Sequence, residues 1–555
     1  MRRFGVLVIL ALLTPLVPLR PVLAAGPSPG SVQTPLSDFN GDGYHDLAVG
    51  VLLEDIGRDR DAGGVNVLYG SATGLQATAP ADQFWSQDSP GVEGGAEEGD
   101  LFGASLAAGD FNNDTFSDLA IGAPFEDIGR IEDAGGVNVL YGSATGLQTT
   151  APADQFWSQD SPGVDGGAED FDAFGFSLAA GDFNDDGFAD LAIGAAFEGL
   201  KGAVGAGAVN VLYGSATGLQ VTSPSDQVWH QDSPSVQGGA EVFDNFGWFV
   251  AAGDFNGSGH DDLAIGVPFE DLSGRDDAGA VNVLYGSAGG LQATSPDDQV
   301  WHQNSPDVDG GAENGDLFGE FVATGDFNDD GFADLATSVA GEDLAGGLFD
   351  AGLVSVLYGS AGGLQATSPA DQIWTQDSPD VEDEAEAGDL FGFAPASGDF
   401  NGDGFDDLSV SAFLEDIGDI AEAGAAHVLY GSAGGLQATS PADQFWHQDS
   451  PGVEDEAEEV DLFGSALAGA DFNNDGFADL AIGVQDEDVV DVMDAGAANV
   501  LYGSMAGLQT TAPADQFWHQ NSPDVEGGAE AGDLFGWGFA TGEAGALGDR
   551  VRRPR

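Results

Sequence analysis

A nine-residue segment rich in aspartate and asparagine recurs seven times, and its residue types suit a hard metal ion. The first copy reads DFNGDGYHD, from Asp38 to Asp46, with oxygen-bearing side chains at positions 1, 3, 5 and 9 and glycine at position 6. These match the first nine positions of a calcium loop of the EF-hand type, in which position 7 coordinates through its carbonyl oxygen. The bidentate glutamate of position 12 is missing, so local groups or water would complete the coordination.

The candidate ligands are the residues at positions 1, 3, 5, 7 and 9 of each copy. They are Asp38, Asn40, Asp42, Tyr44 and Asp46; Asp110, Asn112, Asp114, Phe116 and Asp118; Asp182, Asn184, Asp186, Phe188 and Asp190; Asp254, Asn256, Ser258, His260 and Asp262; Asp326, Asn328, Asp330, Phe332 and Asp334; Asp399, Asn401, Asp403, Phe405 and Asp407; and Asp471, Asn473, Asp475, Phe477 and Asp479. Thr115 replaces the usual glycine in the second copy and Ser258 replaces an aspartate in the fourth, so we expect weaker sites there.

The role expected of the metal is structural. Three carboxylates in one short loop repel one another unless a cation lies among them. A single copy could be an ordinary turn rich in Asp and Asn, but seven copies in fixed register argue against that explanation. Hard oxygen ligands in a flexible loop favour Ca²⁺ over Mg²⁺. The sequence therefore predicts up to seven structural calcium ions, whose removal lowers the melting temperature.

Each loop belongs to a repeat of about 72 residues, and self-similarity at a fixed period indicates a repeat architecture. In the second repeat, short apolar runs bounded by turn residues predict strands over residues 102–110, 118–123, 136–141 and 155–159. No segment of the repeat shows sustained helical periodicity. Four short antiparallel strands per repeat, in a closed series, are typical of a β-propeller.

The two ends of the repeat array indicate how the ring closes. The first repeat begins at Asp38 without a preceding Phe-Gly strand, whereas the last element, FGWGFATG at residues 535–542, is such a strand without a loop after it. Pairing these two ends removes both exposed sheet edges. The predicted fold is all-β: a seven-bladed β-propeller of four-stranded antiparallel blades over residues 38–542, closed by pairing the C-terminal strand with the first blade. An open solenoid is the alternative.

The composition narrows the possible partners. The 555 residues include 95 Asp and Glu against 12 Lys and Arg, which gives a formal net charge of −83. Such a charge repels nucleic acid and anionic membranes, so neither is expected as a partner. The chain has no cysteine, which excludes disulfides, thiolate metal sites and cysteine catalysis.

The N-terminal residues predict export. Arg2 and Arg3 precede an apolar stretch from Phe4 to Leu19, and a cleavage site follows near Ala25, as in a secretory signal peptide over residues 1–25. An uncleaved anchor is the alternative. We expect a linker over residues 26–37, a disordered basic tail over residues 543–555 and no membrane span. The protein is expected to be secreted or extracellular, at the cell surface or in a periplasm.

The segment FGASLAAGDFNNDTFSDLAIGAP, residues 102–124, resembles an FG-GAP repeat, the unit of the N-terminal propeller of integrin α-chains. The resemblance extends over residues 38–542 and implies a seven-bladed propeller with calcium in the loops between first and second strands. It also implies extracellular recognition, and by position it implies Asp182, Asn184, Asp186, the Phe188 carbonyl and Asp190 as ligands of one blade. We expect no leg domains and no membrane span, and every repeat carries a metal loop, unlike integrin α-chains. This simpler architecture looks more like that of secreted microbial FG-GAP proteins.

The few basic residues of the predicted propeller are clustered. Arg58, Arg60, Arg130, Lys201 and Arg275 all fall in the predicted loops between second and third strands of the first four blades. In an up-and-down blade these loops lie on the face opposite the metal loops. Two explanations stay open: local charge balancing, and a partner-binding sector formed by blades one to four.

Catalysis has little support in the sequence, which shows no Ser-His-Asp order, phosphate-binding glycine loop or histidine-rich metal cluster. A tryptophan recurs in every repeat, from Trp85 to Trp518, and could either stack on sugars or pack in the blade core. The sequence therefore predicts a recognition or adhesion module that is not an enzyme and that binds an extracellular protein or glycan. The alternative is a calcium-dependent carbohydrate-binding propeller, and the oligomeric state stays open.

Overall fold

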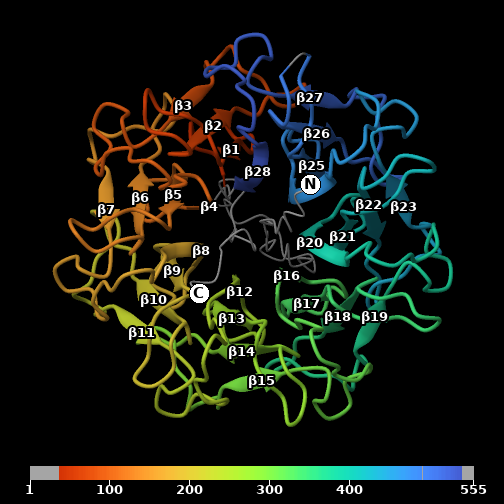
Figure 1. Ribbon diagram of the computed structural model, residues 1–555, viewed down its shortest axis with the longest axis horizontal. Helices are drawn as coiled ribbons and strands as arrows, with labels where there is room; N and C mark the ends of the chain where they lie inside the picture. The colour runs from red at the N-terminus through yellow and green to blue at the C-terminus, as the bar shows by residue number, and fades with distance from the viewer. Residues whose placement is uncertain (1–36, 491, 541–555) are drawn as a thin grey trace, which may run out of the picture.

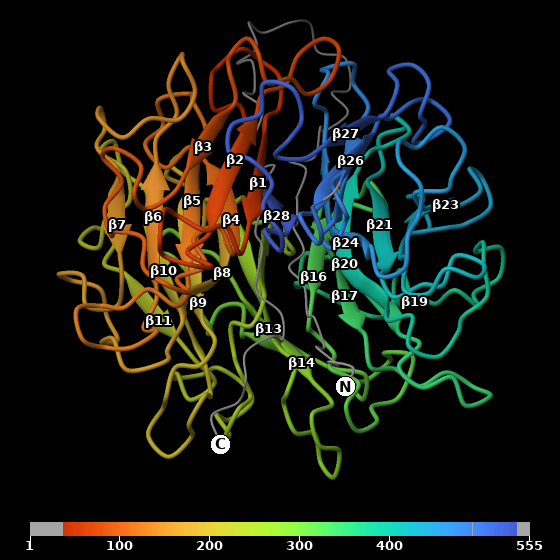
Figure 2. The same ribbon diagram turned by 45° about the horizontal axis from the view of Figure 1, so that its top comes forward.

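The computed structural model describes residues 37–490 and 492–540, which form seven four-stranded antiparallel sheets around a central axis (Figure 1). The view in Figure 2 shows the strands of each sheet running between two faces of loops. The predicted signal peptide, most of the predicted linker and the predicted basic tail lie outside the described residues. No helix in the part of the chain that the structure describes is long and apolar enough to cross a membrane.

The blades follow one another around the ring in chain order. Blade 1 holds β28 (Phe535–Ala540), β1 (Leu47–Val51), β2 (Gly64–Leu68) and β3 (Gln83–Trp85); blade 2 holds β4 (Ser105–Gly109), β5 (Asp118–Ala123), β6 (Gly136–Leu140) and β7 (Gln155–Trp157); blade 3 holds β8 (Phe174–Gly181), β9 (Asp190–Ala195), β10 (Ala208–Leu212) and β11 (Gln227–Trp229); blade 4 holds β12 (Val250–Gly253), β13 (Asp262–Val267), β14 (Ala280–Leu284) and β15 (Gln299–Trp301).

The remaining three blades repeat this order. Blade 5 holds β16 (Val322–Gly325), β17 (Asp334–Val339), β18 (Leu353–Leu357) and β19 (Gln372–Trp374); blade 6 holds β20 (Phe391–Gly398), β21 (Asp407–Ala412), β22 (Ala425–Leu429) and β23 (Gln444–Trp446); blade 7 holds β24 (Phe463–Ala470), β25 (Asp479–Val484), β26 (Ala497–Leu501) and β27 (Gln516–Trp518). The four strands of each blade are called A to D, from the axis outwards (Figure 1).

The ring closes as the sequence predicts. The C-terminal strand β28 pairs antiparallel with β1, with Ala540 opposite Ala48 and Phe539 opposite Val49. All six residues of β28 are buried. The last strand of the chain therefore completes the blade that the first residues of the propeller begin, and the prediction of an all-β, seven-bladed propeller closed in this way is confirmed.

Small residues in strands A and B let neighbouring blades approach each other. A Cβ atom at Gly122 of β5 would lie 2.3 Å from the carbonyl oxygen of Gly175 in β8 of the next blade, so only glycine fits there. The predicted strand over residues 102–110 is shorter in the structure, Ser105–Gly109, whereas strand A of blades 3, 6 and 7 begins at the Phe of the Phe-Gly pair: Phe174, Phe391 and Phe463. Strand B of the second repeat has the predicted bounds.

Each blade presents two kinds of loop on each face. The backbone N–H of Gly142, after strand C, donates to Asp118 at the end of the A–B loop over 2.9 Å, so A–B and C–D loops share one face. The N–H of Gly99, in the D–A loop, donates to the Arg60 carbonyl in the B–C loop over 2.9 Å. We call these faces the A–B face and the B–C face.

Two glutamines, one in the outer strand and one just after it, connect neighbouring blades at the two faces. On the A–B face, Gln155 Nε2 of blade 2 donates to the Leu219 carbonyl of blade 3 over 3.1 Å. On the B–C face, Gln159 Nε2 donates to Glu198 Oε2 over 2.7 Å. These hydrogen bonds recur around the ring, and the sequence pattern did not predict them.

Candidate metal loops

The first aspartate of each A–B loop organises the loop backbone, as blade 3 illustrates. Asp182 Oδ1 accepts the N–H of Asp186 at 3.1 Å, and Asp182 Oδ2 accepts the N–H of Gly187 at 2.8 Å. Asp186 Oδ1 in turn accepts the N–H of Phe188 at 3.2 Å. Gly187 has a φ of +87°, which glycine adopts without strain. These bonds turn positions 1 and 5 toward the inside of a tight loop.

The last aspartate of the loop lies deepest. Asp190 is fully buried, and its carboxylate accepts the N–H of Phe183 at 3.1 Å and that of Gly214 at 2.8 Å. Asn184 Nδ2 also donates to it. Burial, together with the nearby carboxylates of Asp182 and Asp186, raises the pKa of Asp190 to about 9. A cation in the loop would remove this penalty, because it would favour the ionised form.

The other blades repeat this arrangement. The position-9 aspartates are fully buried in all seven blades, and each accepts the N–H of the glycine after strand C: Asp46, Asp118, Asp190, Asp262, Asp334, Asp407 and Asp479. Burial raises the pKa of Asp262 to about 9 as well. The seven candidate sets are thus each brought together in one loop.

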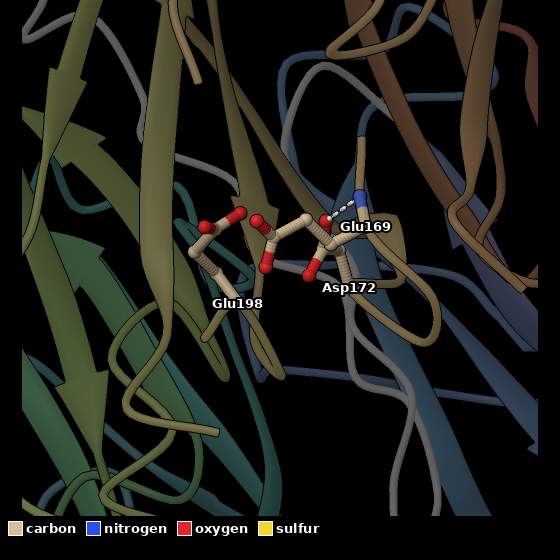
Figure 3. A group of neighbouring side chains, drawn as sticks. All are labelled: Glu169, Asp172 and Glu198. Atoms are coloured by element: carbon tan, nitrogen blue, oxygen red, sulfur yellow. Dashed lines mark hydrogen bonds between the residues drawn. The ribbon is translucent and has the colours of Figure 1, made fainter. Parts of the chain in front are cut away.

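In the described residues, no A–B loop brings carboxylate oxygens of three acidic side chains within 4.8 Å of one another. Glu169, Asp172 and Glu198 form such a group of three, and it lies on the other face (Figure 3). In each A–B loop the asparagine at position 3 turns its amide nitrogen toward the position-9 aspartate, as Asn256 does toward Asp262 at 2.8 Å. A bound cation requires that side chain to turn its oxygen inward instead.

The two deviant copies keep the loop shape. Thr115 takes a φ of +80°, where the other copies have glycine, and its N–H still donates to Asp110 Oδ2 at 2.9 Å. A β-branched residue is strained in this conformation. Ser258 donates its N–H to Asp254 Oδ1 at 2.9 Å but offers a hydroxyl in place of a carboxylate. Weaker binding in these two loops stays a prediction.

Position 8 of the loop has a role that the ligand pattern does not reveal. Its backbone N–H donates to the carbonyl of position 1 in the preceding blade, as Ser117 does to Asp38 and Ala189 to Asp110, both at 3.0 Å. Where position 8 is aspartate, the side chain adds a second bond: Asp261 Oδ2 accepts the N–H of Asp182 at 2.8 Å. Neighbouring loops are therefore coupled along this face. The constant spacing of the A–B loops from one repeat to the next is the sequence signal that could have suggested this coupling between neighbouring loops.

The predicted basic residues all lie exposed in B–C loops of blades 1 to 4: Arg58, Arg60, Arg130, Lys201 and Arg275. Arg275 Nε donates to the Ala312 carbonyl at 2.8 Å, so one of them supports a neighbouring loop. The recurring tryptophans are half-buried and pack against the core, as Trp157 does beside the cluster that contains Val137. One side of each indole is therefore buried by core packing. Trp85 also lines a surface pocket together with Pro80 and Glu526.

The fold and the loops together define a class: a seven-bladed β-propeller with an aspartate-rich loop between strands A and B of every blade. Comparison with known families then identifies the repeat. The FG-GAP repeat model matches seven times, at residues 33–68, 102–140, 174–212, 246–284, 318–357, 391–429 and 463–501. The chain belongs to the FG-GAP repeat family, which confirms the resemblance found in the sequence.

The chain is similar to parts of much longer curated proteins. It is 34% identical over 184 residues to phosphatidylinositol-glycan-specific phospholipase D of Bos taurus, which is 33% of this chain and 20% of that protein. It is 31% identical over 250 residues to integrin alpha pat-2 of Caenorhabditis briggsae, which is 42% of this chain and 17% of that protein. The chain therefore spans about a fifth of the length of these relatives.

Among solved structures, the chain is similar to a rhamnogalacturonan lyase of Bacillus licheniformis. The alignment covers 92% of this chain and 94% of the lyase chain, with 10% sequence identity and a TM-score of 0.32. A likeness at this level supports no conclusion on function.

These comparisons correct one prediction from the sequence. A recognition or adhesion module without catalysis was expected, and with it a protein that is not an enzyme. The similarity to phospholipase D, an enzyme by name, overturns that expectation, which was wrong. Absence of catalytic motifs from the repeats does not exclude catalysis, because a segment similar to these repeats over 184 residues is part of a protein named as an enzyme.

Proposed function

We propose that this chain is an exported, calcium-binding FG-GAP propeller, in which the A–B loops hold calcium and stabilise the ring. One observation carries the proposal: in every blade a fully buried aspartate ends a loop that already orients other oxygen-bearing side chains. A buried carboxylate surrounded by like charges is costly without a cation. Oxygen donors in a flexible loop of this pattern suit Ca²⁺.

The expected location follows from the relatives rather than from the loops. The similarity to an enzyme whose name gives phosphatidylinositol glycan, a membrane lipid, as its substrate favours a setting at a membrane surface outside the cell. Calcium is abundant there, so sites of moderate affinity are filled outside cells. An extracellular setting also agrees with the predicted signal peptide. The exposed basic residues of the B–C face are the candidate contact for an extracellular protein or glycan.

The calcium proposal is tested by counting bound ions. Elemental analysis of the full chain after dialysis in calcium is expected to find several calcium ions per chain. Asp190→Asn removes one carboxylate from the loop of blade 3 and is expected to lower the count by one. The matched control, Asp88→Asn, changes an exposed aspartate outside the loops and keeps the count. Absence of calcium from the unmodified chain contradicts the proposal.

A second candidate function is enzymatic, and the similarity to phospholipase D favours it. The candidate reaction is hydrolysis of a phosphatidylinositol glycan, the substrate in that enzyme's name. The assay mixes the full chain with a phosphatidylinositol glycan in detergent and calcium, and measures the released phosphatidic acid. Release above that of a heat-inactivated sample supports this function, and no release at any concentration of folded chain rejects it.

A further inference from the structure

The A–B loops of blades 2 and 7 differ at only two positions. Residues 110–118 read DFNNDTFSD, and residues 471–479 read DFNNDGFAD. At position 6 of the loop, Thr115 of blade 2 takes the place of Gly476 in blade 7. Together with Asn113, two residues earlier, Thr115 completes the pattern Asn-x-Thr, which is the acceptor sequence for N-linked glycans. The blade 7 loop has the same asparagine but lacks the hydroxyl, so it lacks the pattern.

Thr115 holds a backbone conformation that suits glycine better. Its φ is +80°, and that of Gly476 is +93°. Both residues make the same bond, since the N–H of Thr115 donates to Asp110 at 2.9 Å and that of Gly476 donates to Asp471 at 2.8 Å. A β-branched residue is strained here, so glycine would form the same loop at lower cost. The Thr115 hydroxyl has no hydrogen-bond partner in the described part of the chain. Strain that the fold does not require indicates a function for the side chain.

The amide of Asn113 is placed for modification. Asn113 and Thr115 are both exposed in the A–B loop. Asn113 occupies position 4, which is not among the candidate metal ligands, so its side chain is not needed inside the loop. A Cβ atom at Gly187 of the next loop would lie 3.5 Å from Asn113 Nδ2, and the absence of a side chain there leaves room beside this nitrogen. A sugar attached to Asn113 Nδ2 therefore requires no change in the loop.

The sequence holds one other copy of the acceptor pattern, and its asparagine lies in a different environment. Asn256, Gly257 and Ser258 form this copy in the A–B loop of blade 4. Asn256 is half-buried, and its Nδ2 donates to Asp262 Oδ1 at 3.0 Å and to Asp262 Oδ2 at 2.8 Å. Asp262 is fully buried. A sugar on Asn256 Nδ2 would break these bonds and enter the loop, so the folded chain excludes it. Exposure thus distinguishes the two copies.

We propose that Asn113 is the acceptor of an N-linked glycan on the A–B face of blade 2. The donor is a sugar joined through its C1 atom to a diphosphate, and a glycosyltransferase catalyses the transfer. Asn113 Nδ2 forms a bond to C1 and loses one proton to a base of the enzyme, while the bond between C1 and the diphosphate oxygen breaks and the diphosphate leaves with the electron pair. The glycan leaves the B–C face and its basic residues open to a partner. This assignment rests on the export proposed above but not on calcium in the A–B loops.

The test secretes the full chain from yeast cells behind an added leader of proven function. Peptide N-glycosidase in heavy-oxygen water then converts each asparagine that carries a glycan into a labelled aspartate, which mass spectrometry of peptides locates. The label is expected at Asn113 in more than half of the folded chains and at Asn256 in almost none. Unlabelled Asn113 in secreted, folded chain overturns the site, and equal labelling of the two asparagines overturns exposure as the deciding factor.

A parallel culture without the added leader tests export by itself. A chain that stays in these cells, but is labelled at Asn113 when the added leader secretes it, rejects the predicted signal peptide and supports the glycan site. A chain that is secreted in both cultures and labelled in neither supports export and overturns the glycan site.

Two matched variants test the role of Thr115. Thr115→Val keeps the branched shape and the strained backbone but removes the hydroxyl, and is expected to abolish labelling of Asn113; a persistent label overturns the role of the hydroxyl. Gly476→Thr completes the acceptor pattern in the blade 7 loop, where Asn474 occupies position 4, and is expected to add a second labelled residue there. Unlabelled Asn474 in folded Gly476→Thr overturns position 4 of this loop as an acceptor.

Discussion

A chain that ends at Leu534, and so lacks β28, is expected not to form a stable propeller. Phe535, Trp537 and Phe539 of β28 are all fully buried. Burying one such side chain contributes about 2–3 kcal/mol, so the three together match a large part of the roughly 5–15 kcal/mol that stabilises a folded domain. The truncated chain also leaves β1 as an unpaired edge, which promotes aggregation. Thermal melting and size-exclusion chromatography measure both effects.

The control for this truncation is a chain that ends at Gly542, which keeps β28 and loses only residues 543–555. It is expected to melt at the temperature of the full chain. A cooperative, monomeric melt of the chain that ends at Leu534, within a few degrees of the control, would show that ring closure contributes little to stability.

Removal of calcium is expected to lower the melting temperature by about 10–20 °C. A free calcium concentration of 100 times the Kd adds about 2.7 kcal/mol for each occupied site. If seven such sites stabilise one cooperative unit, their summed free energy divided by the unfolding entropy of a chain of this size gives a shift in melting temperature of about 10–20 °C. Calorimetry of the full chain in calcium and in excess chelator measures the shift. Identical melts in the two conditions contradict a structural role for the metal.

The chelated chain is also expected to become more stable as the pH falls from 8 to 5.5. Burial raises the pKa of Asp100 to about 8 and that of Glu126 to about 7. Because these folded-state values lie above those of the unfolded chain, the contribution to stability is present at low pH and is lost as the pH rises through 7 and 8. Glu126→Gln is expected to flatten this dependence. A chelated chain that melts lower at pH 5.5 than at pH 8 would refute this explanation.

The sequence alone predicted the architecture because the repeat is strict. Strand B of the second repeat has the predicted bounds, and the pairing of β28 with β1 was expected from the incomplete first and last repeats. The apolar runs and the turn residues between them predict the strands, because both patterns reflect local backbone preferences and the burial of side chains, which a single sequence records. The start of strand A in the second repeat was placed too early, at Phe102 rather than Ser105, although the same Phe-Gly pair begins strand A in blades 3, 6 and 7.

The candidate site was predictable only in part. The spacing of Asp182, Asp186 and Asp190 identified one loop with oxygen-bearing side chains, because all its members lie within nine residues. The link from position 8 to the preceding loop joins residues 79 positions apart, as in Asp182 and Asp261, and no local pattern reports such a contact. The similarity to an enzyme also lay beyond what the repeat itself could show.

The sequence by itself determined the repeat, the number of blades, the strand that closes the ring and the loops that carry aspartate, because each of these depends on spacing along the chain. Only the tertiary structure decided how deeply Asp190 is buried and which blades meet at each seam. Only the fold, likewise, brings Gln159 and Glu169 of the D–A loop together with Glu198 of the B–C loop. Distances across a seam depend on the packing of two blades. Spacing along one chain contains no information on that packing.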